Sequence, residues 1–250
     1  MDLFDDFDRP APIALPEGDG YSCEWDEASK TFLIRVPNGQ MIYSADFLDD
    51  ECSDGFLSHL QESDQGVLSP NQWREVTDIE SVDFKNIRWK QDKIKMYGDV
   101  IPLPRLTSWY GDSGSNYTYS GISSQPNEWT PELFELKQRI EAAIGSKFNS
   151  VLLNWYRDGD DHLSWHADDE VELGNEPTIA SVNFGATRDF ILRRKDNHAE
   201  KLVVPLGQGS LLVMAGELQT FWEHSVPKRK KVKESRFNLT FRKILNSSAW

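Results

Sequence analysis

Cysteine and long apolar runs are both scarce in this sequence. The only cysteines are Cys23 and Cys52, and there is no Cys-x-x-Cys pair, so neither a disulfide framework nor a structural zinc site is expected. No apolar run reaches the roughly 20 residues that a membrane-spanning helix needs. The acidic start, Met1 to Asp6, lacks the basic and apolar regions of a secretory signal. We therefore expect a soluble, intracellular protein with no membrane segment.

Positive charge is also in the minority. The chain carries 27 Lys and Arg against 41 Asp and Glu, a formal net charge of −14. The charge is uneven, because residues 1–70 hold 16 acidic against 3 basic side chains, a difference of −13, whereas residues 185–250 hold 6 against 13, a difference of +7. Salt screens charges beyond roughly 10 Å, so an anionic partner responds to the local field more than to the total. The basic half therefore leaves nucleic acid open as a partner.

The first part of the chain mixes several kinds of pattern. Residues 1–20 are rich in Asp, Pro and Gly and predict a disordered tail. Residues 21–46 read as a small β unit, and residues 47–61 as a helix. The clearest helix spans residues 131–144, because Thr130 suits the N-cap, Pro131 the first turn and Gly145 the C-terminal end.

From residue 150 onward, strand patterns recur at short intervals with no helix between them. The expected strands are 150–156, 163–167, 178–184, 189–194, 201–206, 210–215, 220–226 and 236–244. Eight short strands of this kind indicate a sandwich or a jelly roll.

A candidate metal site lies in this β region. His166 and Asp168 are two residues apart and would project from the same face of a strand. His224, from a distant strand, would complete a set of two histidines and one carboxylate, which suits Fe(II) and leaves coordination positions open. Taken alone, the His-x-Asp pair is weak, because isolated polar pairs usually lie on solvated surfaces.

The last predicted strand alternates strictly. Arg236, Asn238, Thr240 and Arg242 share one face, and phenylalanine and leucine share the other. An ordinary outer strand has the same pattern. If the polar face points into a barrel, the buried arginines need an anionic partner, and a dicarboxylate fits their planar, bidentate fork.

Along the chain, His166-Ala167-Asp168 is followed by His224 and then by the alternating strand from Arg236 to Arg242. This order of motifs resembles the AlkB family of Fe(II)- and 2-oxoglutarate-dependent dioxygenases, and the nucleic-acid repair demethylases of the human type in particular. The resemblance covers residues 87 to 245, with weaker likeness back to residue 40. Further motifs that carry it are Pro104-Arg105-Leu106-Thr107-Ser108-Trp109-Tyr110-Gly111, Tyr117-Thr118-Tyr119-Ser120, Asn154-Trp155-Tyr156-Arg157-Asp158-Gly159 and Ala180-Ser181-Val182-Asn183-Phe184-Gly185-Ala186-Thr187-Arg188.

The resemblance implies a role for each matching residue. Iron would be bound by His166, Asp168 and His224. The 2-oxoglutarate pocket would be formed by Asn154, Tyr156, Arg236, Asn238 and Arg242. The substrate residues would be Arg105 at the nucleic-acid lid, Tyr117, Tyr119 stacked on a flipped base, and Glu170 as the reader of the damaged base.

The resemblance also implies an activity and a fold. The expected reaction is oxidative demethylation of N-alkylated bases such as 1-methyladenine and 3-methylcytosine in DNA or RNA, with Fe(II), O₂ and 2-oxoglutarate, releasing formaldehyde. The alternative is a 2-oxoglutarate dioxygenase that acts on protein or a small molecule. We expect a monomer in the nucleus or the cytoplasm, with a protein partner as one role for the N-terminal tail.

The expected fold is α+β, mainly β, with a double-stranded β-helix (jelly roll) core, a supporting helix and an N-terminal lid region. We divide the chain into a disordered acidic tail (1–20), a β/helical extension (21–86), a nucleotide-recognition lid with the scaffold helix (87–146), the jelly-roll catalytic core (147–245) and a short tail (246–250).

Two further features carry open alternatives. Tyr97 aligns with the position where double-strand-acting relatives insert an aromatic wedge into the duplex, but a turn residue that merely packs gives the same pattern. The basic run at Lys228, Arg229, Lys230 and Lys231 suits contacts with phosphates. It also resembles a nuclear localisation signal, and a solvated charge run is the third interpretation.

Overall fold

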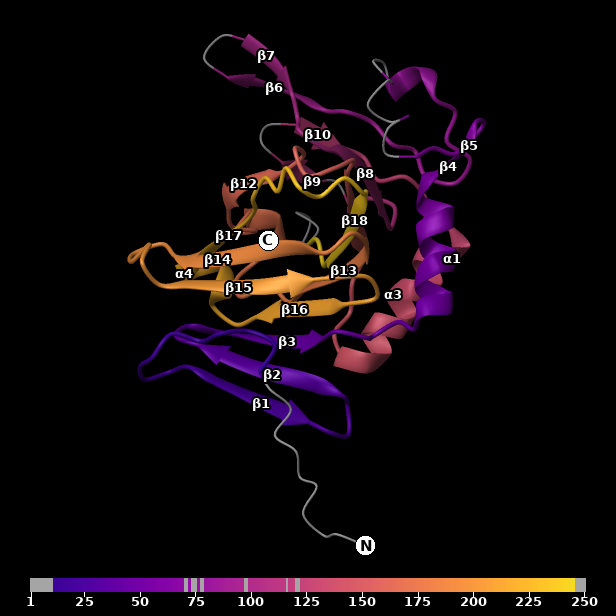
Figure 1. Ribbon diagram of the computed structural model, residues 1–250. Coiled ribbons are helices and arrows are strands. Elements are labelled where there is room, and N and C mark those ends of the chain that lie inside the picture. The colour runs from indigo at the N-terminus through magenta and orange to yellow at the C-terminus, as the bar shows by residue number, and fades with distance from the viewer. Residues whose placement is uncertain are drawn as a thin grey trace, which may run out of the picture.

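Figure 1 shows the computed structural model of the protein, which describes residues 11–69, 72, 76, 79–96, 99–115, 117–119 and 122–245. At residues 80, 95, 96, 117–119 and 122–124 it describes the backbone alone. The described part is mainly β, as predicted, with two large antiparallel sheets and two longer helices. Within this part, none of the helices combines the length and apolar character needed to cross a bilayer.

The larger sheet has eight strands and joins distant parts of the chain. Their spatial order is β1 (Ser22–Asp26), β2 (Thr31–Val36), β3 (Gly39–Ser44), β16 (Leu211–Ala215), β13 (Ile179–Gly185), β18 (Arg236–Arg242), β11 (Ser150–Tyr156) and β8 (Leu106–Gly111). The N-terminal strands therefore extend the same sheet through the pairing of β3 with β16, and β8 extends it at the other edge by pairing with β11.

The smaller sheet has four strands, in the order β12 (Leu163–His166), β17 (Trp222–Val226), β14 (Arg188–Arg194) and β15 (Lys201–Leu206). Three two-stranded ribbons complete the described strands: β4 (Glu62–Ser63) with β5 (Gly66–Val67), β6 (Lys93–Met96) with β7 (Asp99–Pro102), and β9 (Tyr117–Tyr119) with β10 (Ile122–Ser124). The β6–β7 ribbon stands out from the body of the protein (Figure 1).

The alternation predicted for residues 236–242 is realised in β18, which is buried along its whole length. Phe237, Leu239 and Phe241 pack in one apolar cluster with side chains of the helices α1 (Asp50–Gln61) and α3 (Pro131–Ile144). Burial of such side chains contributes about 1.5–3 kcal/mol each. The helices thus cover one face of the large sheet, and the polar side chains of β18 line a cavity on the other face.

Capping residues mark both ends of α3 and the start of α1. The prediction for α3 is confirmed, since Thr130 Oγ1 accepts from Leu133 N at 3.2 Å and Gly145 ends the helix with a φ of 72°. The prediction for α1 began too early, because Asp49 Oδ1 caps Cys52 N at 2.8 Å and the helix starts at Asp50. The predicted strand 220–226 also starts too early, because its first two residues belong to the single helical turn α4 (Leu218–Phe221) and β17 begins at Trp222. Two short 3₁₀ turns, η1 (Ile79–Ser81) and η2 (Val171–Leu173), complete the described helices.

Glu141 fastens the end of α3 to the segment that leads into β11. Its Oε1 accepts from Phe148 N at 2.8 Å, and Lys137 Nζ and Lys147 Nζ lie 2.9 Å from its two oxygens. Burial acts to raise the pKa of Glu141, but these donors outweigh burial and lower the pKa below its usual value. A carboxyl with a lowered folded-state pKa stabilises the fold above its unfolded pKa and loses that contribution as the pH falls through the folded pKa.

We therefore expect Glu141→Gln to lower the free energy of unfolding at neutral pH by about 1–3 kcal/mol. The variant should also lose less stability than the parent on acidification below about pH 4.5. Urea denaturation at neutral and acidic pH measures both effects. Parallel stability–pH curves for parent and variant would contradict this role.

Candidate functional site

Two of the predicted metal ligands face each other across a pair of neighbouring strands. His166 in β12 is the register partner of His224 in β17, and their ring centroids lie 4.2 Å apart. His166 Nδ1 lies 2.9 Å from Ser164 O. A carbonyl only accepts, so Nδ1 carries the proton and Nε2 keeps a free lone pair. Paired strands therefore present two imidazoles to one point.

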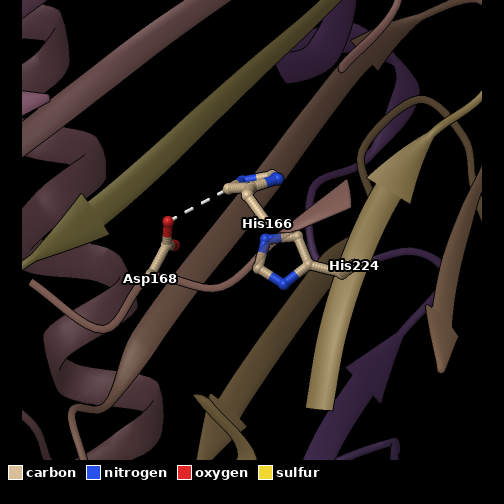
Figure 2. A group of neighbouring side chains, drawn as sticks. All are labelled: His166, Asp168 and His224. Carbon is tan, nitrogen blue, oxygen red and sulfur yellow. Dashed lines mark ion pairs between the residues drawn. The ribbon is translucent and has the colours of Figure 1, made fainter. Parts of the chain in front are cut away.

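Asp168 completes the group from a position beyond the strand. The strand β12 ends at His166, so the prediction of one continuous strand through residue 167 is wrong. The carboxylate nevertheless turns to the same point, as Figure 2 shows. One ligand atom of each of the three residues lies within 4.8 Å of those of the others, and the His166 Nε2 to Asp168 Oδ1 distance is 3.8 Å.

Burial and neighbouring charge set the protonation states of these groups. Burial lowers the pKa of His166, and burial together with His166 lowers that of His224 to about 3. Burial acts to raise the pKa of Asp168, but Arg242 and the two imidazoles outweigh it and lower this pKa to about 2. At neutral pH the group is thus two neutral imidazoles and one carboxylate, which is the form that binds a divalent metal.

The polar face of β18 forms a buried network beside this group. Arg236 Nη2 donates to Asn183 Oδ1 at 2.6 Å, and Asn238 Nδ2 donates to Ser181 Oγ at 2.7 Å. Arg236 Nε and Nη1 are buried and have no hydrogen-bond acceptor among the described residues. Burial lowers the pKa of Arg236 to about 10, so the guanidinium stays charged at neutral pH. A buried cation with two open donors calls for an anion.

One cavity between the two sheets contains both the metal-ligand group and the polar network of β18. It is lined by Arg105, Leu152, Asn154, Tyr156, Leu163, His166, Asp168, Ser181, Phe190, Met214, His224, Val226, Arg236, Asn238, Thr240 and Arg242. All of the predicted metal and co-substrate residues are in this set. The predicted lid residue Arg105 is there too, buried, and its Nε donates to Asn154 Oδ1 at 3.0 Å. Arg242 Nη2 donates to Asp168 Oδ2 at 2.7 Å, so one arginine connects the metal half to the co-substrate half.

The predicted substrate residues are placed less fully. Glu170 is half-buried and immediately precedes η2. The backbone of Tyr117 and Tyr119 forms β9, but their side chains lie outside the described part of the chain. Tyr97, the candidate base wedge, lies outside the described residues altogether.

The basic run divides into two kinds of side chain. Lys228, Lys230 and Lys231 are exposed. Arg229 is half-buried, and its Nε donates to Asp189 Oδ2 at 2.7 Å. Three lysines are thus available to an anion in solution, whereas Arg229 already has an acidic partner.

Several residues at the site escaped the sequence interpretation. Asn183 accepts from both Arg236 and Asn238, and Ser181 accepts from Asn238. Ser181 and Asn183 are two residues apart on β13 and point to the same side of the strand. The alternation within the motif from Ala180 to Arg188 could therefore have identified them. Gln219 Oε1 accepts a hydrogen bond from the backbone N–H of Asp168, and no pattern in the sequence predicted that contact.

Arg188 is the other residue that went unassigned. It is fully buried and donates to three backbone carbonyls: Asp158 O at 3.0 Å, Asp161 O at 2.9 Å and Pro227 O at 2.6 Å. Its guanidinium also lies over the ring of Tyr156. Arg188 therefore holds the loop before β12 and the start of the basic run against the cavity wall.

Arg188→Met is expected to lower the free energy of unfolding by about 3–5 kcal/mol, because three carbonyls lose a charged donor. Urea denaturation of the metal-free protein measures this loss. Arg139→Met is a suitable control, since Arg139 is exposed and donates to one carbonyl, Phe47 O; we expect a loss below about 1 kcal/mol. Equal losses in the two variants would contradict the role given to Arg188.

The sequence model of the 2OG-Fe(II) oxygenase superfamily matches residues 65–242. The chain is 45% identical over 170 residues to the rat protein named alpha-ketoglutarate-dependent dioxygenase alkB homolog 3, an alignment that covers 64% of this chain and 57% of the relative. It is 44% identical over 160 residues to the human DNA oxidative demethylase ALKBH2, covering 61% of each. For the Arabidopsis thaliana protein of that name the identity is 38% over 187 residues, covering 64% of this chain and 60% of the relative.

The chain therefore spans about three fifths of the length of these relatives. A solved structure titled "The structure of OsALKBH1" superposes with a TM-score of 0.51 and 17% identity, covering 84% of this chain and 99% of the other. This likeness concerns the fold alone.

Proposed function

Because the chain belongs to the AlkB family within the 2OG-Fe(II) oxygenase superfamily, we propose that it demethylates N-alkylated bases of DNA or RNA with Fe(II), 2-oxoglutarate and O₂. One observation carries this proposal. A single cavity brings three suitable metal ligands together with a buried arginine that has two open donors.

The residues fit the metal that the family name implies. His166, Asp168 and His224 would hold Fe(II), since two imidazoles and one carboxylate suit this ion and leave positions for other ligands. Asp168 Oδ1 is buried and has no hydrogen-bond donor among the described residues, so it is available to a cation. When bound, the iron supplies the activation of O₂ that the oxidation requires.

The polar network fits the co-substrate. Arg236 would pair with the distal carboxylate of 2-oxoglutarate through its two open donors. Asn154, Tyr156, Asn238 and Arg242 line the same space and would orient the rest of the molecule. With 2-oxoglutarate bound, the buried walls of the cavity would keep bulk water from these charged contacts and so strengthen them.

The balance of the reaction follows from these components. One oxygen atom of O₂ enters succinate as 2-oxoglutarate loses CO₂, and the other is inserted into a C–H bond of the N-methyl group. The N–C bond of the resulting hydroxymethyl group then breaks, which releases formaldehyde and restores the base. A methyl group on a pairing nitrogen of adenine or cytosine also weakens base pairing, so such a base costs less to flip.

Substrate residues are proposed around the cavity. Glu170 would offer negative charge to a positively charged methylated base, and Tyr119 would stack on its ring. Tyr117 and Arg105 would complete this side, with Tyr97 as a candidate wedge. Phosphates would be contacted by the exposed side chains of Lys228, Lys230 and Lys231. Arg229, the fourth member of the basic run, is paired with Asp189. With a nucleic-acid substrate, the proposed location of the protein is the nucleus or the cytoplasm.

The two facing sheets support a double-stranded β-helix as the core. The proposed division of the chain is a catalytic core at residues 147–245, a recognition region with α3 at 87–146 and an extension at 21–86. The extension contributes β1, β2 and β3 to the sheet of the core, so we expect it to fold with the core rather than independently.

The test is incubation with Fe(II), 2-oxoglutarate and a single-stranded oligonucleotide that contains one 1-methyladenine. We expect mass spectrometry to detect loss of the methyl group, and no loss when either Fe(II) or 2-oxoglutarate is omitted. Matched duplex and RNA substrates then define the preferred nucleic acid. Succinate formation without loss of any methyl group would contradict the proposal and favour a protein or small-molecule substrate.

A further inference from the structure

The backbone N–H of Asp168 is paired in an unusual way. Asp168 lies two residues beyond the end of β12, where the strand ladder does not reach it. It is 1% exposed, and a buried N–H needs an acceptor. That acceptor is the side-chain oxygen of Gln219, Oε1, at 2.9 Å.

The three candidate metal ligands are consequently held by two different means. His166 and His224 are fixed relative to each other by the register of β12 and β17. Asp168 has no such pairing, so its backbone position depends on the contact with Gln219. Arg242 orients the carboxylate group itself through Asp168 Oδ2.

Gln219 is well placed to anchor the segment of Asp168. It is 3% exposed and lies in α4, five residues before His224. Lys195 Nζ donates to Gln219 O at 2.8 Å and to Asp169 Oδ2 at 3.1 Å, and Lys195 N donates to Phe221 O at 2.9 Å. The turn α4 and the chain around Asp168 are thus tied together at two adjacent residues.

We propose that Gln219 is a positioning residue for the metal site, one that sets the place of Asp168 relative to the two histidines. The proposal rests on the iron-binding role inferred above for these three residues. Without Gln219 Oε1, the N–H of Asp168 must find another acceptor, and the segment shifts to reach one. A shifted carboxylate no longer meets both imidazoles at one metal ion.

The test uses Gln219→Met, which keeps the length of the side chain and removes the acceptor. We expect the affinity for Mn²⁺, a redox-stable substitute for Fe(II), to fall about 10–100-fold, measured by the electron paramagnetic resonance signal of unbound Mn²⁺. Gln219→Asn keeps an acceptor on a side chain that is one methylene shorter, so its affinity for Mn²⁺ should fall less than that of Gln219→Met. If Gln219→Met does not fold, Gln219→Asn provides the comparison with the parent.

Gln208→Met is the matched control. Gln208 Oε1 also accepts from a backbone N–H, that of Gly185 at 3.2 Å, but Gln208 lies outside the lining of the cavity. We expect this variant to bind Mn²⁺ like the parent. An equal loss of affinity in Gln208→Met and Gln219→Met would indicate general destabilisation and overturn the proposal.

A second readout needs no metal. Hydrogen exchange of the Asp168 amide in the metal-free protein should accelerate in Gln219→Met and stay unchanged in Gln208→Met. Faster exchange with parental Mn²⁺ affinity, or unchanged exchange, would overturn the proposal. Neither readout involves a nucleic acid, so a failed demethylation assay and a failed positioning role remain distinguishable.

Discussion

His166→Ala is expected to lower turnover by more than about 100-fold, because loss of a ligand exceeds the 10–100-fold effect of losing a residue that only supports one. His166 offers Nε2 to the group while its Nδ1–H is occupied by Ser164 O. With one imidazole and one carboxylate, the remaining pair cannot hold the metal in the arrangement that leaves adjacent positions open. Loss of the methyl group from the oligonucleotide under saturating Fe(II) measures the effect.

The chain offers a close control for this substitution. His162 Nδ1 contacts a backbone carbonyl two residues earlier, Asp160 O at 3.1 Å, as His166 contacts Ser164 O. His162 is outside the metal-ligand group. His162→Ala should therefore retain most of the turnover. Equal losses of turnover in His162→Ala and His166→Ala would contradict the assignment of His166 as a metal ligand.

Arg236→Gln is expected to raise the KM for 2-oxoglutarate by at least about 100-fold, since removing one partner of a buried ion pair costs about 3–5 kcal/mol. The KM for the oligonucleotide should change little, because Arg236 lies in the half of the cavity assigned to the co-substrate. Arg236→Lys keeps the charge without the bidentate fork, so its KM for 2-oxoglutarate should lie between those of the parent and Arg236→Gln. Initial rates at varied 2-oxoglutarate and fixed oligonucleotide measure these values.

Unfolding provides a check that this loss is local. In the protein without metal and co-substrate, Arg236 is a buried charge with two open donors and one hydrogen bond, to Asn183 Oδ1. Its removal relieves the cost of an uncompensated buried charge, which offsets the lost hydrogen bond. Arg236→Gln should therefore unfold at the parental temperature or above it. A clearly lower unfolding temperature, with an unchanged KM for 2-oxoglutarate, would sink the assignment of Arg236.

The sequence predicted the parts of the fold that follow from local periodicity. The strict alternation at residues 236–242 became β18, with Phe237 and Leu239 against the helices and Arg236 in the cavity. The capping residues of α3 fixed its ends in the same way. These features depend on neighbours in the sequence, so the sequence alone carries them.

Contacts between distant segments were harder to predict. Arg188 donates to carbonyls at positions 158, 161 and 227, and Gln219 accepts from Asp168 across 51 positions. Backbone partners leave no mark on the sequence, because every residue type supplies the same carbonyl and almost every type the same N–H. The pairing of Arg229 with Asp189 was hidden for a related reason, since a basic run does not show which of its side chains already have acidic partners.

The stoichiometry of a single reaction tests the central claim most directly. With Fe(II), O₂, 2-oxoglutarate and an oligonucleotide that carries 1-methyladenine, succinate, formaldehyde and restored adenine should form in equal amounts. All three should disappear together in His166→Ala. Restored adenine without succinate, or succinate in large excess over formaldehyde at saturating oligonucleotide, would contradict demethylation coupled to 2-oxoglutarate in this cavity.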